Sequence, residues 1–267
     1  MPLSVCATPI GNLADVTLRV LSELAGADLV LCEDTRRTRI LLDRHGISAP
    51  LVSYHEHNEA KRVQEVLPRL VRGERVALVS DAGLPGINDP GARLVAAALE
   101  AGVAVTVLPG PSAVETALVA SGFAVERYQF LGYLPRGEKP LAELWAKLAR
   151  WPYTAVAFES PRRLPATLAS LAKALPARPV AVCRELTKAF EEVVRGSATE
   201  VAGLIREMPK GEITLVVGPA AVAGVDEAEP LEALAELLAS GVPRRQAADV
   251  VARLSGLSRN RLYRASL

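Results

Sequence analysis

Residues 76–91 read VALVSDAGLPGINDPG, an apolar, strand-like run that stops abruptly at a loop rich in glycine and proline. Two other apolar runs end in similar loops, TPIGNL at 8–13 and PGPSA at 109–113. Glycine lets the backbone approach a ligand closely and proline stiffens a turn, so each loop could form a rigid wall. One such loop is equally well explained as a tight strand-to-helix turn. Three loops on one edge of a sheet favour a pocket.

The surrounding pattern predicts that the three loops share such an edge. Between residues 1 and 121, short β-branched runs alternate with helical patterns, as is typical of a parallel sheet flanked by helices. Ligands of open parallel sheets bind beyond the carboxyl ends of the strands, where these loops lie. The five predicted strands are 3–10, 29–34, 51–54, 75–81 and 104–109.

The pattern changes after Gly122 and predicts a second α/β domain, in which the strands at 180–186 and 191–197 follow closely enough to pair antiparallel. We expect the chain to divide into an N-terminal α/β domain at 1–121, a second at 122–220 and a small C-terminal helical module at 226–267, with a linker at 219–225. The other strands predicted in the second domain are 127–134, 154–160 and 212–218, and its helices are 138–150, 162–175 and a segment ending near 207.

The C-terminal module differs in charge from the rest of the chain. Residues 240–267 hold six arginines and one acid, although the net charge of the whole chain is only +1. An apolar helix face, a turn at Ser255-Gly256 and an N-cap at Ser258 follow in the order of a helix-turn-helix. This predicts contacts with nucleic-acid phosphates; a helical cap packed on its own chain is the alternative. The predicted face comprises Ala247, Val250, Val251 and Leu254, and the final helix carries Arg259, Arg261 and Arg264.

Several classes of protein are excluded or disfavoured. The chain contains neither G-x-G-x-x-G nor G-x-x-x-x-G-K-[ST], which argues against a dinucleotide-binding fold and a phosphate-binding loop. No apolar run approaches the ~20 residues that cross a bilayer, and the start lacks a basic signal region, so we expect a cytoplasmic protein. The three cysteines lie in apolar runs and are predicted to be buried, and the three histidines lack metal-ligand spacing, so no metal is expected.

Charged residues gather after the predicted strands, at Glu33-Asp34-Thr35-Arg36, at Glu159 and Arg162, and at Arg184-Glu185 with Lys188. Charged groups in a cleft are functional candidates. Each could equally be a structural ion pair, and Asp34 in particular could cap a helix and pair with Arg37 or Arg39.

Together these stretches resemble the tetrapyrrole methylase-fold proteins, and within them bacterial methyltransferases of small-subunit ribosomal RNA. The resemblance implies two α/β domains with S-adenosylmethionine in the cleft between them, normally in a homodimer. It also implies methyl transfer to the ribose 2′-hydroxyl of a cytidine in the decoding region of 16S rRNA, in naked RNA or in the assembled small subunit. The matching motifs, in family order, are ATPIGNLADVT, EDTRRTRILL, SDAGLPGINDPG, LPGPSA, FLGYLPR, FESPRRL, CRELTKAFEEVVRG and GEITLVVG.

The resemblance gives candidates for the cofactor site but does not identify the catalytic side chain, for which the charged residues at the strand ends are the candidates. A ribose hydroxyl is a poor nucleophile, so it must be aligned with the methyl donor and lose its proton. We expect a carboxylate from Glu33, Asp34 or Glu185 to accept that proton, and Arg36, Arg184 or Lys188 to hold the adjacent phosphate. By motif matching, the cofactor-lining candidates are Pro9, Asp81, Leu84, Ile87, Asp89, Ser112, Ala113, Phe158 and Thr214.

Two other functions remain open. A small-molecule methylase acting on a precorrin-like tetrapyrrole would use the same cleft, but it would leave the arginine-rich C-terminal segment unexplained. A regulator whose α/β body senses a ligand and whose C-terminal module binds DNA would explain that segment, but it would not need charged residues beside the cofactor.

Overall fold

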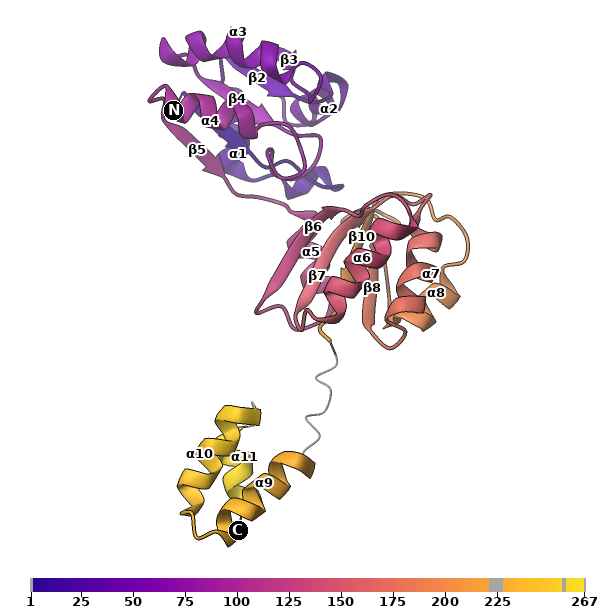
Figure 1. Ribbon diagram of the computed structural model, residues 1–267. Helices are drawn as coiled ribbons and strands as arrows, with labels where there is room; N and C mark the ends of the chain where they lie inside the picture. Colours follow the sequence, from indigo (N-terminus) through magenta and orange to yellow (C-terminus); the bar gives the residue numbers. More distant parts are fainter. Residues whose placement is uncertain (1, 221–227, 256–257, 267) are drawn as a thin grey trace. The chain divides into compact units, whose positions relative to one another are not determined.

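A computed structural model describes residues 2–220, 228–255 and 258–266 (Figure 1). The chain divides into two compact units, Met1–Gly218 and Pro219–Leu267. The first unit contains both sheets and the second contains the C-terminal helices. Among the described residues, no helix is both long and apolar enough to span a bilayer.

The first sheet is parallel throughout, with strand order β3-β2-β4-β1-β5. All five strands lie where the sequence predicts them, but each ends one to four residues earlier than expected. Helices α3 and α4 pack on one face and α1 and α2 on the other, so the central strands are buried on both sides. The strands are β1 (Leu3–Cys6), β2 (Leu29–Cys32), β3 (Leu51–Ser53), β4 (Val76–Val79) and β5 (Val105–Leu108). The helices are the 3-10 turn η1 (Leu13–Asp15), α1 (Leu18–Ala25), α2 (Thr35–Arg44), α3 (Glu59–Val71) and α4 (Ala92–Glu100).

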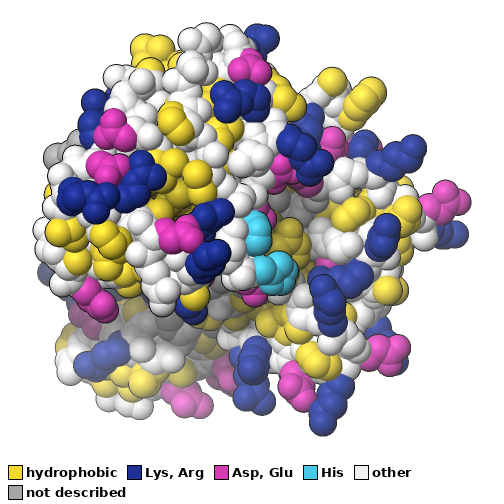
Figure 2. All heavy atoms as spheres, turned by 90° about the horizontal axis from the view of Figure 1, so that it is seen from above, with side chains coloured by type: hydrophobic (Ala, Val, Ile, Leu, Met, Phe, Trp, Pro, Cys, Tyr) yellow, Lys and Arg dark blue, Asp and Glu magenta, His cyan; other side chains and the backbone are white. Residues whose placement is uncertain are grey.

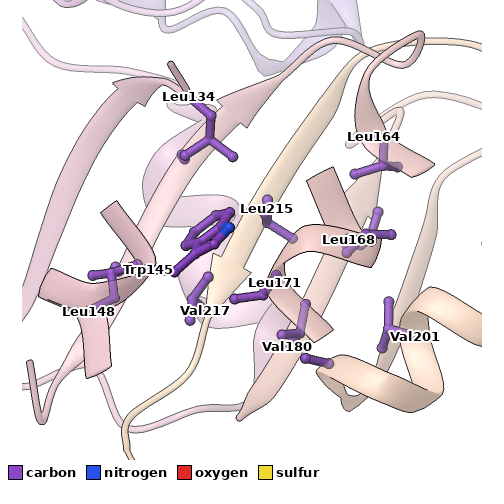
Figure 3. Close-up of a cluster of buried hydrophobic side chains, with 14 of the residues drawn as sticks. Leu134, Trp145, Leu148, Leu164, Leu168, Leu171, Val180, Val201, Leu215 and Val217 are labelled. Atoms are coloured by element: carbon purple, nitrogen blue, oxygen red, sulfur yellow. The ribbon is translucent and has the colours of Figure 1, made fainter. Parts of the chain in front are cut away.

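The second sheet is mixed, with strand order β6-β7-β10-β8-β9. β6 and β7 are parallel and the other neighbours are antiparallel, including β8 and β9 as the sequence indicates. One face is covered by α6, α7 and α8, where Trp145 packs among leucines and valines (Figure 3). The strands are β6 (Tyr128–Tyr133), β7 (Thr154–Glu159), β8 (Pro179–Arg184), β9 (Glu192–Ser197) and β10 (Ile213–Val217). The helices are α6 (Glu138–Ala149), α7 (Leu164–Ala174) and α8 (Ala198–Leu204).

Helix α5 (Ala113–Ser121) covers the other face of the second sheet. Its Val114, Ala117 and Leu118 are buried against side chains of β7, β8 and β10. By its packing, α5 therefore belongs with the second sheet, although the sequence groups it with the first. The division of the chain at residues 121 and 122 stays a prediction.

The described part of the C-terminal unit contains the helices α9 (Ala228–Ala239), α10 (Arg244–Ser255) and α11 (Arg259–Ala265). Its core is formed by Leu234, Ala247, Ala248, Val251 and Leu262. Leu254, which the sequence places on the buried face, is 81% exposed, because α10 turns Ala248 into the core instead. Most of the expected linker and Gly256 of the expected turn lie outside the described residues.

Candidate active site

A cavity of about 460 Å³ lies at the carboxyl ends of the strands of the first sheet. Residues from all three glycine- and proline-rich loops line it: Ile10 after β1, the stretch 81–84 and 87–89 after β4, and 112–114 after β5. The second sheet supplies further lining, including Tyr133, Phe158 and Thr214. The three loops therefore meet at one pocket, as the sequence indicates.

Eight of the nine residues expected at the cofactor line this cavity: Asp81, Leu84, Ile87, Asp89, Ser112, Ala113, Phe158 and Thr214. Pro9 does not, because it is buried behind the loop, and its neighbour Ile10 faces the cavity in its place. Their contact with a cofactor stays a prediction.

The lining is strongly acidic. Five carboxylates and one guanidinium, Arg37, line the cavity. Asp81 accepts a hydrogen bond from the backbone N of Asp34 at 3.0 Å, and its Oδ2 lies 3.3 Å from Nη1 of Arg37. The acidic residues are Glu33, Asp81, Asp89, Glu159 and Glu212. A pocket of this charge favours a cationic ligand.

Glu33 and Asp89 differ from the other acids in the cavity. Neither forms a salt bridge with any described residue. Partial burial, and secondarily the charge of Asp81, raises the pKa of Glu33. Burial, followed by the charge of Glu33, raises the pKa of Asp89 to about 6. A carboxyl whose pKa is raised in this way is suited to accept a proton near neutral pH.

Asp34 and Arg36, two of the expected catalytic residues, do not line the cavity. The Asp34 side chain caps α2 by accepting from the backbone N of Arg36 at 2.9 Å, and its Oδ2 lies 2.7 Å from Nη2 of Arg36. These hydrogen bonds from Arg36 lower the pKa of Asp34, which makes it a poor base. Asp34 therefore caps α2, which was one of the two alternatives that the sequence allowed. It pairs with Arg36 rather than with Arg37 or Arg39.

Arg184, Glu185 and Lys188 also lie outside the lining, in a charged cluster at its rim. Lys188 Nζ lies 2.8 Å from Glu185 Oε1 and 3.1 Å from Oε2 of Glu212, and Glu212 lines the cavity. The hydrogen bond from Lys188 lowers the pKa of Glu185. Arg184 pairs with Glu192 at 3.0 Å. Of the three expected proton acceptors, only Glu33 faces the cavity.

Two further lining residues come from strand ends of the second sheet: Tyr133, which was not expected at the site, and Glu159, one of the charged candidates. Tyr133, 64% exposed, packs edge to face against Phe158, with ring centroids 5.6 Å apart. Glu159 is fully buried, pairs with Arg163 at 2.5 Å and accepts from Thr167 Oγ1 at 2.7 Å. Tyr133 lies in the quoted motif FLGYLPR, so its position at a strand end could have indicated it.

Two family models together match nearly the whole chain. Residues 2–202 match the model of the Tetrapyrrole (Corrin/Porphyrin) Methylases, and residues 224–267 match that of the RsmI C-terminal HTH domain.

Solved structures show the same fold at low sequence identity. The methyltransferase CobJ is 21% identical with a TM-score of 0.62, over 82% of this chain and 94% of that one. Diphthine synthase is 15% identical with a TM-score of 0.60, over 81% of this chain and 89% of that one.

Curated relatives are much more similar in sequence. Proteins named "Ribosomal RNA small subunit methyltransferase I" are 45% identical in Mesorhizobium japonicum, over 99% of this chain and 91% of the relative. The relative from Synechocystis is 42% identical over 99% of this chain and 97% of the relative. The relative from Mycobacterium bovis is 46% identical over 98% of this chain and 93% of the relative. This chain belongs to the tetrapyrrole methylase family and, within it, to the family of ribosomal RNA small subunit methyltransferase I.

Proposed function

We propose that this protein transfers the methyl group of S-adenosylmethionine to the ribose 2′-hydroxyl of a cytidine in the decoding region of 16S rRNA. The observation that carries this proposal is the acidic cavity at the strand ends, in a chain whose relatives are named for small-subunit ribosomal RNA. We further propose that it works in the cytoplasm as a homodimer, as the family resemblance implies.

The residues of the cavity fit the cofactor. S-adenosylmethionine supplies an electrophilic methyl group on a positively charged sulfur. The cavity volume of about 460 Å³ lies within the ordinary range for small-molecule sites. Its excess of carboxylates favours a cation, and the exposed backbone of the glycine- and proline-rich loops supplies donors and acceptors for polar groups.

Asp89 is the carboxylate best placed to accept the proton. It faces the cavity, forms no salt bridge with a described residue, and has a pKa of about 6. S-adenosylmethionine held by the loops after β1, β4 and β5 would supply the methyl group for the ribose oxygen, and Asp89 would accept the proton that the hydroxyl gives up. The charge of Glu33 contributes to the raised pKa of Asp89 and so favours the protonated form of Asp89.

The C-terminal helices supply basic groups for RNA phosphates. Arg259 is tied to Asp249 at 2.5 Å, which joins α11 to α10. The other arginines with described side chains are exposed: Arg244, Arg245, Arg253 and Arg264. RNA helices offer little sequence information to side chains, so phosphate contacts suit this module.

The test is mapping of the methyl group. Small ribosomal subunits lacking the modification would be incubated with labelled S-adenosylmethionine and the protein, and the RNA then digested with alkali. Because alkaline cleavage needs a free 2′-hydroxyl, one alkali-resistant linkage after a cytidine is expected. A label on a base would contradict the 2′-hydroxyl assignment, and an unlabelled RNA would contradict the RNA substrate. Ala113→Trp, which fills the cavity, is the control.

A further inference from the structure

A second cavity, of about 260 Å³, adjoins the first. It is lined by Tyr133, Leu134, Arg136, Ser160 and Arg163. Tyr133 and Ser160 line both cavities, so the two meet at this tyrosine. Neither the cofactor nor the proton acceptor accounts for the smaller cavity.

The backbone on the N-terminal side of Tyr133 has an irregular conformation that sets the direction of the Tyr133 side chain. The β6–β7 pairing shifts register between Phe130 and Tyr133, which marks a β-bulge, and Gly132 within it has a φ of +65°. A bulge re-aims the side chains that follow it and is common beside active sites. A Cβ at Gly132 would lie 2.9 Å from Oδ1 of Asn88, so the bulge packs directly on the loop after β4.

The backbone on the C-terminal side of Tyr133 is equally fixed. Arg163 donates from Nη2 to the carbonyl oxygen of Leu134 at 3.0 Å and from Nη1 to that of Pro135 at 3.1 Å. Arg163 is itself held by the buried carboxylate of Glu159. The backbone on both sides of Tyr133 is therefore fixed by contacts that leave this residue 64% exposed. A large aromatic side chain held open at a cavity mouth is typical of a binding surface.

Arg136 gives the smaller cavity a charge opposite in sign to that of the larger, acidic cavity. It is exposed, lines the smaller cavity, and forms no hydrogen bond or salt bridge with any residue that the structure describes. An aromatic ring and an unpaired guanidinium three residues apart match the base and the phosphate of one nucleotide. A phosphate is repelled by the five carboxylates of the larger cavity, so it fits the smaller one.

We propose that the smaller cavity is a nucleotide subsite for single-stranded RNA, in which Tyr133 stacks on the base and Arg136 binds the phosphate of the nucleotide whose ribose enters the larger cavity. This rests on the proposed function and names the residues that hold its substrate. It assigns the RNA contact to the body of the protein as well as to the C-terminal helices.

The test uses the full-length protein with labelled S-adenosylmethionine and small ribosomal subunits. The variants are Tyr133→Ala, Tyr133→Phe and Arg136→Ala, with Arg150→Ala, at the opposite end of α6, as the charge control. We expect Tyr133→Ala and Arg136→Ala each to raise the half-saturating subunit concentration about ten-fold, as losing a stacked base or a phosphate contact does. Tyr133→Phe and Arg150→Ala stay within about two-fold, because a phenyl ring still stacks. The dissociation constant of the cofactor stays unchanged in all four.

The outcomes separate this inference from the proposed function. An active wild-type protein whose Tyr133→Ala and Arg136→Ala variants saturate normally would overturn the nucleotide subsite and leave the function standing. A wild-type protein that methylates no RNA would overturn both. A changed molecular mass of Tyr133→Ala in solution would identify the tyrosine as a contact between subunits, which also overturns the subsite.

Discussion

The two walls of the candidate active-site cavity come from strand ends of two sheets, yet they differ in which charged groups are left without a partner of opposite charge among the described residues. The wall from the first sheet carries Glu33, Asp81 and Asp89 on glycine- and proline-rich loops. The wall from the second sheet carries Phe158 and Tyr133, and its carboxylates Glu159 and Glu212 are paired with Arg163 and Lys188. Arg136 lies just beyond this wall. Acids suit a cationic cofactor and a departing proton, whereas aromatic and basic groups suit a nucleotide. We infer that the unpaired carboxylates of the first wall serve proton transfer, that Tyr133 and Arg136 serve the nucleotide, and that the cofactor contacts both walls.

The largest effect is expected at Asp89, on the wall that the first sheet supplies, which we call the acidic wall. Asp89→Asn keeps the shape of the side chain but removes the proton acceptor, so the single-turnover rate falls by about 10² to 10⁴-fold. Cofactor binding, followed separately by calorimetry, stays within a few-fold. Asp34→Asn is the matched control, because Asp34 caps α2 and does not line the cavity. Equal losses in the two variants would remove Asp89 from the mechanism.

The pH profile sharpens the same assignment. Asp89 accepts a proton only when ionised, and its pKa is about 6. The wild-type rate therefore rises with pH through about 6 and levels off above it, and Asp89→Asn lacks this limb. The effect on stability has the opposite sign. The pKa of Asp89 in the folded protein lies above the ordinary value of 3.8, so the free energy of unfolding falls as pH rises from 3.8 through about 6 and Asp89 ionises. Urea unfolding at pH 7 should find Asp89→Asn no less stable than the wild type.

The second sheet supplies the wall with Phe158 and Tyr133, which we call the aromatic wall. There, Glu159 pairs with Arg163, and Arg163 in turn holds the backbone that follows Tyr133. Glu159→Gln leaves Arg163 unpaired in a partly buried position, so we expect about 2 kcal/mol less unfolding free energy. Glu65→Gln, which removes an exposed pair with Arg62, should cost under about 1 kcal/mol in the same urea titration. Comparable losses would show that the buried pair does not hold this wall together.

A smaller effect is expected at the C-terminal helices. The double variant Arg244→Ala/Arg245→Ala should weaken binding to small subunits and reduce the slope of log affinity against log salt by about one to two units. The control is Arg19→Ala/Arg44→Ala, two exposed arginines on helices of the first sheet. If the slope of log affinity against log salt were the same in both double variants, the C-terminal arginines would not contact RNA phosphates, and the aromatic wall would be the remaining RNA contact.

The smallest effect is expected at Arg36, outside both walls. Arg36→Ala removes an exposed pair with Asp34 but leaves the helix cap, so we expect stability to stay nearly unchanged and the methylation rate to change by less than about two-fold. Thermal unfolding and a single-turnover assay would check both. A rate loss above ten-fold would return Arg36 to the phosphate-binding role that the sequence predicts.

The sequence was sufficient for the strands and for the loops that meet at the cavity. Period-two apolar runs and glycine- and proline-rich turns are local signals, and in a parallel sheet every strand end reaches the same edge. It could not separate Glu33 from Asp34 in the same four-residue stretch. One faces the cavity and the other caps α2, which depends on where the helix begins.

Tyr133 and Leu254 show a second limit. Tyr133 reaches the cavity through a register shift in β6, and a bulge is specified by the pairing of two strands rather than by one strand. Leu254 fits the apolar spacing of α10 but is exposed, because the partner helices bury Ala247 and Ala248 instead. Such features arise from packing between segments distant in the chain.

The most direct test compares Asp89→Asn with Tyr133→Ala in single-turnover methylation of small ribosomal subunits, over a range of subunit concentrations at saturating cofactor. We expect Asp89→Asn to lower the rate at saturation with an unchanged half-saturating concentration, and Tyr133→Ala to raise the half-saturating concentration with an unchanged rate at saturation. If both variants changed the same parameter, the assignment of one wall to the chemistry and the other to the RNA would be wrong.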